Sequence, residues 1–272
     1  MNEPVWVWGL PLAPLTMSET CEAAARLVEA RRPSYFITAN VHQAMLTERH
    51  PDLAEFNANA AFLVADGAPL VWASRIKGSP LPERVAGSDL LFELARRGAK
   101  LGHRVFLLGG GPGIALEAGR RLERKYPGLL IVGVESPPFH DPTPDEESAL
   151  ASQIRAARAD ILFVALGSPK GERWMARNLP LLNVPLCIQV GASLDFAAGR
   201  VRRAPPWIQR IGMEWAFRTA VEPRRLLRRY AANAWFILRM VRRDFVRSLR
   251  RPIGSETSSE TVVVRSQETP PT

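Results

Sequence analysis

Residues 105–113 read VFLLGGGPG, an apolar run that ends in a glycine-rich turn. After the turn, residues 113–126 carry apolar side chains at helical spacing. An apolar run that leads through a tight turn into a helix is typical of a buried strand at the start of a strand–helix unit. This stretch therefore predicts one unit of an α/β fold.

Five further apolar runs repeat this pattern along the chain. They are continuous rather than alternating, as is typical of parallel strands covered on both faces. The runs span residues 35–38, 61–65, 129–134, 161–166 and 186–190, with helical patterns at 19–30, 90–100 and 146–158 between them. The alternation predicts a Rossmann-like α/β domain with a parallel-sheet core over residues 1–199.

The positive charge of the chain is concentrated near its C-terminus. The 272 residues carry a formal net charge of +9, and residues 200–251 hold 15 arginines against three acidic residues. Residues 1–199 are close to neutral, while residues 255–272 are rich in Ser, Thr, Glu and Pro. We therefore expect an arginine-rich helical appendage over 200–251 and a disordered tail over 252–272.

The cysteines and the N-terminus indicate a cytoplasmic setting. Cys21 and Cys187 lie far apart, without the spacing of a zinc site or of a disulfide framework. The N-terminus lacks the basic start and apolar run of a signal peptide, and the apolar stretch 235–238 is too short to span a bilayer. We expect a protein that is made in the cytoplasm and does not cross a membrane by itself.

Polar and glycine residues follow five of the predicted strands. In a parallel α/β sheet, ligands bind outside the carboxyl ends of the strands, so these residues are candidates for one shared cleft. They include Thr38, Asn40, Asp66, Gly109, Gly110, Gly167, Pro169, Lys170 and Asp195.

The glycine loop at 109–113 allows two interpretations. Its backbone N–H groups could approach a phosphate at a helix N-terminus, or the loop could be only a tight strand–helix turn. The GxGxxG spacing of dinucleotide-binding proteins fails because residue 114 is Ile. No acid follows the next strand to hold a ribose, unless Glu135 serves.

Asp66 is the candidate general base. A carboxylate at the edge of a sheet, with its pKa raised by partial burial, can accept a proton from a hydroxyl. Alternatively, Asp66 caps a helix that begins near Pro69. Thr38 and Asn40 could bind sugar hydroxyls, although forming turns is the usual role of such residues.

A bound metal ion is not expected. No DxD motif occurs, and the four histidines show no ligand-like clustering. A departing diphosphate would then need arginines or helix N-termini to stabilise its charge. Arg84, Arg203 and Arg218 stand in motif-like settings, with solvated surface arginines as the alternative.

The segment 231–251 reads as an amphipathic helix suited to an anionic membrane surface. Its apolar residues keep helical spacing, with arginines elsewhere on the wheel, and Trp235 and Phe236 could insert among the headgroups. The apolar stripe consists of Trp235, Leu238, Val241, Phe245 and Leu249. The stripe could instead be ordinary core or a dimer interface, so the oligomeric state stays open.

The chain resembles the WecG/TagA/CpsF family, glycosyltransferase family 26, over about residues 5–235. The resemblance rests on several motifs in order rather than on one. They are TAN at 38–40, ADG at 65–67, RVAGSDL at 84–90, LGG at 108–110, LGSPK at 166–170 with Glu172, VGA at 190–192 with Asp195, RAP at 203–205 and EW at 214–215.

The resemblance implies an inverting, metal-independent transferase with no cofactor, which acts in bacterial cell-surface polysaccharide biosynthesis. It would move a hexose or N-acetylhexosamine from a UDP-sugar to a polyprenyl-diphosphate-linked saccharide, as a peripheral protein on the inner face of the cytoplasmic membrane. Asp66 resembles the general base of the family, and Arg84 resembles a positioning residue. The expected substrate-binding residues are Thr38, Asn40, Arg84, Gly109, Gly110, Gly167, Pro169, Lys170, Glu172, Asp195, Arg203, Arg218, Arg225 and Arg229.

One position departs from the family pattern. The family commonly has Pro-Lys-Gln-Glu, whereas this chain reads PKGE at 169–172. Another group then supplies the missing amide contact, or Gly171 marks a different sugar preference.

Two other classes compete with a transferase. A nucleotide-dependent oxidoreductase would use the α/β pattern and the glycine loop, and a nucleic-acid-binding protein would use the basic segment 200–251. We expect no nucleic-acid partner.

Overall fold

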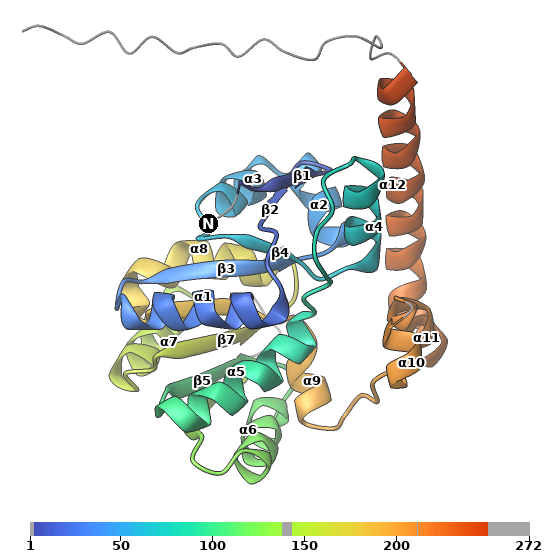
Figure 1. Cartoon of the computed structure of the whole chain (residues 1–272). Coiled ribbons are helices and arrows are strands. Elements are labelled where there is room, and N and C mark those ends of the chain that lie inside the picture. The colour runs from blue at the N-terminus through green and yellow to red at the C-terminus, as the bar shows by residue number, and fades with distance from the viewer. Residues whose placement is uncertain (1–2, 138–142, 211, 250–272) are drawn as a thin grey trace, which may run out of the picture.

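The computed structural model describes residues 3–137, 143–210 and 212–249, and the predicted tail at 252–272 lies outside them. These residues form an α/β fold on an eight-stranded sheet with the order β1-β2-β4-β3-β8-β7-β5-β6 (Figure 1). The strands are β1 Val5–Val7, β2 Leu10–Leu12, β3 Ser34–Ala39, β4 Leu63–Ala65, β5 Arg104–Gly109, β6 Leu130–Glu135, β7 Ile161–Ala165 and β8 Leu186–Gln189. The first two pair antiparallel, and all the other pairings are parallel.

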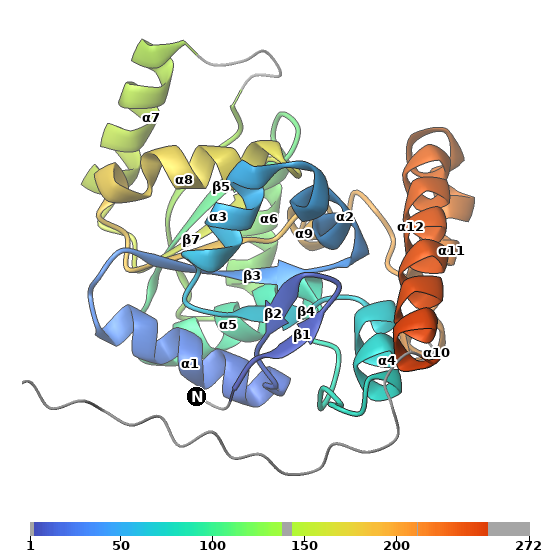
Figure 2. The ribbon, with the colours of Figure 1, turned by 90° about the horizontal axis from the view of Figure 1, so that it is seen from above.

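Helices cover both faces of the sheet (Figure 2). Alternate strand residues face opposite sides, so Val105 and Leu107 belong to one apolar cluster, while Phe106 and Leu108 belong to the other. The first cluster is covered by α1 (Met17–Glu29), α5 (Gly87–Leu101), α6 (Ile114–Lys125) and α9 (Ser193–Ala197). The second is covered by α2 (Val41–Arg49), α3 (Pro51–Ala58), α7 (Pro144–Ala156) and α8 (Lys170–Leu182).

The prediction of a Rossmann-like parallel sheet is confirmed, and the six apolar runs correspond to β3–β8. The hairpin formed by β1 and β2 was not predicted from the sequence. Its strands have three residues each, and its turn consists of Trp8 and Gly9, both with positive φ. A tryptophan in the left-handed region is uncommon, so this turn lacks the usual Asn-Gly or Asp-Gly signal.

The C-terminal segment is helical, as predicted. It contains α10 (Pro206–Arg210), α11 (Glu214–Val221) and α12 (Pro223–Leu249), and α12 lies beside α4 (Ala68–Ile76) in both ribbon views. Asp244 on α12 accepts a hydrogen bond from Trp8 Nε1 at 3.1 Å and pairs with Lys77 at 3.7 Å. The division of the chain at residue 199 stays a prediction.

One face of α12 packs on the α/β body, and another is exposed. Phe236 and Met240 are buried in the same apolar cluster as strand residues, and Phe236 meets the Trp8 ring edge-on at 6.0 Å. The prediction that Phe236 inserts into a membrane is therefore wrong. The predicted stripe is exposed at Trp235, Leu238, Val241 and Phe245, so ordinary core is also wrong for these four residues. The side chain of the fifth residue, Leu249, lies outside the described part of the structure.

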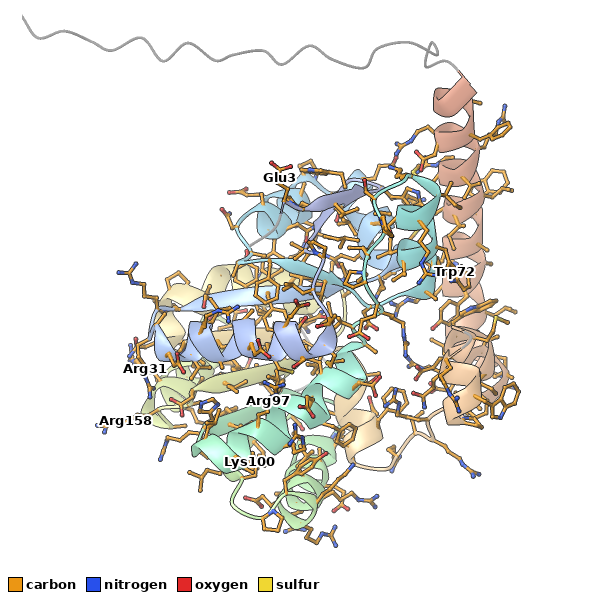
Figure 3. All side chains as sticks on the ribbon, viewed as in Figure 1. Glu3, Arg31, Trp72, Arg97, Lys100 and Arg158 are labelled. Carbon is orange, nitrogen blue, oxygen red and sulfur yellow. The ribbon has the colours of Figure 1, made fainter. Side chains whose placement is uncertain are left out.

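Further exposed apolar residues lie near α12. Trp72 on α4 is 47% exposed, and Figure 3 shows it on the side of α4 that borders α12. Within the part of the chain that the structure describes, no helix combines the length and the apolar character that a membrane crossing requires.

Candidate active site

A cavity of about 860 Å³ opens at the carboxyl edge of the sheet, where α7, α11 and α12 also contribute to its wall. Most of the predicted site residues line it: Thr38, Asn40, Asp66, Arg84, Gly110, Gly167, Lys170, Glu172, Asp195, Arg218 and Arg229. Gly109, Pro169 and Arg203 are not among the lining residues. Arg225 belongs to α12, but its side chain lies outside the described part of the structure.

Asp66 directly follows β4 and is half-buried at the cavity. Burial raises the pKa of its carboxyl group to about 7, against the opposing effects of Arg84 and of a hydrogen bond from the Gly87 backbone N–H. The helix-cap alternative for Asp66 is wrong, because α4 begins at Ala68 with Gly67 as its N-cap residue and without a side-chain cap hydrogen bond. A carboxyl group with this pKa can exchange a proton near neutral pH.

Gly87 allows the N-terminus of α5 to approach this carboxylate. A Cβ atom at residue 87 would lie 2.9 Å from Thr38 Oγ1 and 3.4 Å from Asp66 Oδ2. A larger residue would therefore push the helix away from both side chains. Within the motif at 84–90, this close approach explains why residue 87 is glycine.

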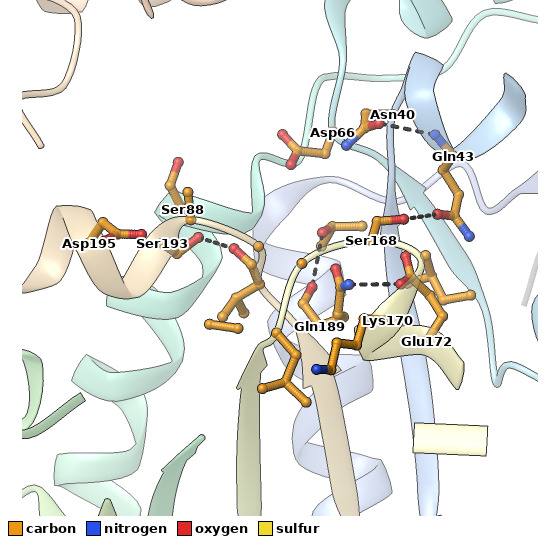
Figure 4. A pocket seen from close by; sticks show the side chains of 18 of the residues that line it. Asn40, Gln43, Asp66, Ser88, Ser168, Lys170, Glu172, Gln189, Ser193 and Asp195 are labelled. Atoms are coloured by element: carbon orange, nitrogen blue, oxygen red, sulfur yellow. Dashed lines mark hydrogen bonds between the residues drawn. The ribbon is translucent and has the colours of Figure 1, made fainter. Parts of the chain in front are cut away.

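Thr38 and Asn40 hold the neighbouring strand end in place. Thr38 Oγ1 donates to the backbone oxygen of Gln189 at 3.4 Å, and Asn40 Oδ1 accepts the backbone N–H of Gln43 at 3.2 Å, which caps α2. Asn40 thus acts as the N-cap of α2, which is a structural role other than the turn that was expected. Both residues also line the cavity, and Figure 4 shows Asn40 beside Asp66.

Arg84 and Arg203 share two carboxylates. Arg84 pairs with Glu214 at 3.4 Å and with Asp89 at 3.9 Å, and Arg203 pairs with the same two residues at 3.6 and 2.5 Å, respectively. Their side chains are only 23% and 20% exposed, so the surface-arginine alternative is wrong for this pair. Glu214 lies on α11, so the network ties the C-terminal helices to the α/β body.

Arg218 and Arg229 bring positive charge to the cavity wall. The Arg218 guanidinium lies over the Phe196 ring at 5.2 Å, and its Nε is buried without a hydrogen-bond partner among the described groups. A half-buried cationic group with a buried, unused N–H donor suits an anionic ligand. No group of three potential metal-ligating side chains occurs among the residues described.

The two glycines of the loop that were expected to bind substrate differ in their surroundings: Gly109 is packed against a neighbouring strand, and Gly110 faces the cavity. Gly109 has a φ of +114°, and a Cβ there would come within 2.5 Å of the Ala165 backbone, so the close packing of β5 on β7 requires it. Gly110 lines the cavity together with Glu135, which ends β6 and accepts a hydrogen bond from Gln153 at 3.3 Å. Glu135, the one acid that the sequence offered after the next strand, therefore lies at the cavity beside the loop.

The start of α8 forms a polar floor that the sequence analysis described only in part. Glu172 is 3% exposed, and burial raises its pKa. Gln189 Nε2 donates to Glu172 Oε2 at 2.9 Å, as Figure 4 shows. Gln189 was missed, although one signal was present: it is the only polar residue in the apolar run 186–190.

A parallel sheet, a cavity at its carboxyl edge, a carboxyl group of near-neutral pKa and half-buried arginines are together typical of an enzyme site that takes an anionic substrate. The chain belongs to the WecG/TagA/CpsF family of glycosyl transferases, whose model matches residues 5–250. This membership confirms the resemblance and favours glycosyl transfer over the oxidoreductase and nucleic-acid-binding alternatives.

A curated relative gives a further comparison. The N-acetylglucosaminyldiphosphoundecaprenol N-acetyl-β-D-mannosaminyltransferase of Bacillus spizizenii is 29% identical over 198 residues. The match covers 73% of this chain and 75% of the relative. The shared region is therefore most of both proteins.

Proposed function

We propose that the protein transfers a hexose or N-acetylhexosamine from a UDP-sugar to a polyprenyl-diphosphate-linked saccharide, with inversion and without a metal ion. The observation that carries this proposal is Asp66, a carboxyl group with a pKa of about 7 in a cavity that arginines also line. The family membership supports glycosyl transfer, and the name of the Bacillus relative supports a lipid-diphosphate acceptor. The pathway would be the synthesis of a cell-surface polysaccharide.

In this mechanism Asp66 accepts the proton of an acceptor hydroxyl. The hydroxyl oxygen forms a bond to the anomeric carbon on the face opposite UDP, and the bond from that carbon to the UDP oxygen breaks. The electron pair leaves with UDP, and the configuration of the anomeric carbon inverts through an oxocarbenium-like transition state. A single carboxylate is enough for this displacement.

The departing UDP gains negative charge, which the arginines of the cavity wall are placed to stabilise. The unpartnered Nε of Arg218 is a donor that no described group uses. A well-placed donor in a comparable oxyanion site contributes about 3 kcal/mol to transition-state stabilisation. Arginines would thus take the part that a divalent cation plays in other transferases.

We further propose that the exposed face of α12 rests on an anionic membrane, so that the enzyme acts as a peripheral protein on its cytoplasmic side. Trp235 is 69% exposed and Phe245 is 63% exposed, with the exposed Arg239 and Arg242 on the same helix. Arginines near an anionic surface contribute about 1 kcal/mol each. Pairing with a second copy of the chain is the competing use of this face.

The test is sugar transfer from a panel of UDP-sugars to short-chain prenyl-diphosphate-linked saccharides, with EDTA present. We expect one donor to be used, and Asp66→Asn to lower kcat at least about 100-fold, because a general base contributes that much or more. Asp52→Asn is the matched control, since Asp52 is an exposed surface residue paired with Arg173. Dependence on a divalent ion, or full activity of Asp66→Asn, would refute the mechanism.

A further inference from the structure

The side chain of Gln189 occupies the space above Gly171. A Cβ atom built on residue 171 would lie 2.7 Å from Gln189 Nε2, 3.1 Å from Cγ and 3.3 Å from Cδ. Gly171 is in the first turn of α8 and does not have a positive φ, so its backbone conformation does not require glycine. Because glycine weakens a helix relative to alanine, the contact with Gln189 is the physical reason for glycine at this position.

Glu172 fixes the orientation of the Gln189 amide. The carboxylate is buried and accepts one N–H of the amide at 2.9 Å. The Gln189 backbone oxygen also accepts the hydroxyl of Thr38. A glutamine side chain has two N–H donors and a carbonyl acceptor. Among the described groups, the second N–H and the carbonyl oxygen remain to bind a ligand in the cavity.

The position of Gln189 in the sheet places this amide between the two ends of the site. Asp66 follows β4, Gln189 ends β8, and Gly110 follows β5, in the strand order β4-β3-β8-β7-β5. Adjacent strands are about 4.8 Å apart, so Gln189 is about 10 Å across the sheet from each end. In a UDP-sugar the anomeric carbon is joined to the diphosphate by a single oxygen. A donor with its nucleotide toward the glycine loop and its diphosphate over the middle of the sheet would have its anomeric carbon and hexose over β3 and β8, between Asp66 and Gln189.

We propose that Gln189 is a specificity-determining residue, which binds a hydroxyl or acetamido group of the transferred sugar and is accommodated by Gly171. This inference rests on the proposed function. The amide that the family commonly carries at position 171 is then supplied from β8. This corresponds to the first alternative for the PKGE motif, in which another group makes the missing amide contact. The site would bind the polar substituents of the hexose through a neutral amide, which a buried carboxylate holds in position.

The experiment is a cycle of Gly171→Ala, Gln189→Gly and the double variant, with kcat/KM measured for every UDP-sugar of the panel. We expect Gln189→Gly to lower kcat/KM for the preferred donor about tenfold and to flatten the ranking of donors, since one hydrogen bond to the sugar is lost. Gly171→Ala should have a similar effect, because its methyl group displaces the amide. In the Gln189→Gly background, Gly171→Ala should change nothing further.

Two measurements separate this role from a structural one. Gly171→Gln combined with Gln189→Gly returns an amide to the same space and should restore the ranking of donors. Melting temperatures show whether each variant is folded, and helix propensity alone predicts that Gly171→Ala is the more stable protein. A loss of donor discrimination without a loss of stability supports binding by Gln189.

The outcomes are distinguishable. If the wild type transfers from no donor, the proposed function fails and this inference fails with it. If the wild type is active but Gln189→Gly keeps both its kcat/KM and its ranking of donors, only the inference is overturned. Equal harm from Gly171→Ala with and without Gln189 would also overturn it, because the effect would then not pass through the amide.

Discussion

Replacement of Asp66 by Asn is expected to stabilise the fold while it removes activity. The pKa of the Asp66 carboxyl group rises from an ordinary 3.8 to about 7 in the folded protein, mainly through burial. Each pKa unit corresponds to about 1.4 kcal/mol, so the ionised carboxylate costs the folded state about 4 kcal/mol at pH 8. The isosteric Asn removes this cost and keeps an oxygen for the Gly87 N–H.

The sign and the pH range follow from the raised pKa. The folded state holds the proton more tightly than the unfolded chain does, so the cost is absent below about pH 3.8 and grows until about pH 7. At pH 5 it amounts to about 2 kcal/mol. The stability gain of Asp66→Asn should therefore be about two and a half times as large at pH 8 as at pH 5.

The assay is urea unfolding of the wild type and of Asp66→Asn at both pH values, with transferase activity measured on the same preparations. Asp52→Asn is again the control. The hydrogen bond from Arg173 lowers the pKa of the Asp52 carboxyl group, so removing the charge of Asp52 should not stabilise the fold. If Asp66→Asn is no more stable than the wild type at pH 8, or if its gain does not depend on pH, Asp66 does not have the raised pKa on which the mechanism depends.

Two further predictions concern pH and the membrane. Below pH 7, kcat/KM should fall about tenfold per pH unit as Asp66 is protonated. Arg84→Gln should move this fall to higher pH, and Glu214→Gln should move it to lower pH, because Arg84 lowers the pKa of Asp66 and Glu214 raises it. Movement of both variants in the same direction would contradict these effects on the pKa. Trp235→Glu should weaken binding to phosphatidylglycerol vesicles about tenfold. Leu181→Glu on α8 should not, although Leu181 is also an exposed apolar residue; equal effects in a sedimentation assay would refute the docking face.

The sheet was predictable from the sequence because its strands are buried on both faces. Continuous apolar runs such as 161–166 leave little ambiguity when they alternate with helical patterns. The β1–β2 hairpin was not predictable, because three-residue strands and a Trp-Gly turn carry no pattern. The two apolar faces of α12 were also hidden: Trp235 and Phe236 are neighbours in sequence, but one is exposed and the other is buried.

The site was predictable where residues follow strand ends, as at Asp66, and where several motifs occur together. Contacts between distant segments were not. The pairing of Arg84 with Glu214 joins residues 130 positions apart, and only the fold brings them together. Likewise, Gly171 read as a departure from a motif, and the reason for it became visible only with Gln189 folded over it.

The two sides of α12 limit how far from a membrane surface the enzyme could reach its acceptor. Ala234 and Ile237 border the cavity, whereas Trp235 and Leu238, each one residue further along, point outward. An α-helix with its side chains is about 10 Å across, so on a docked enzyme only this thickness would separate the reaction centre from the lipid. An acceptor anchored in that bilayer would present the sugars next to its diphosphate and hold the far end of a long glycan out of range. On an enzyme docked as proposed, this geometry would suit the addition of early units to a growing chain.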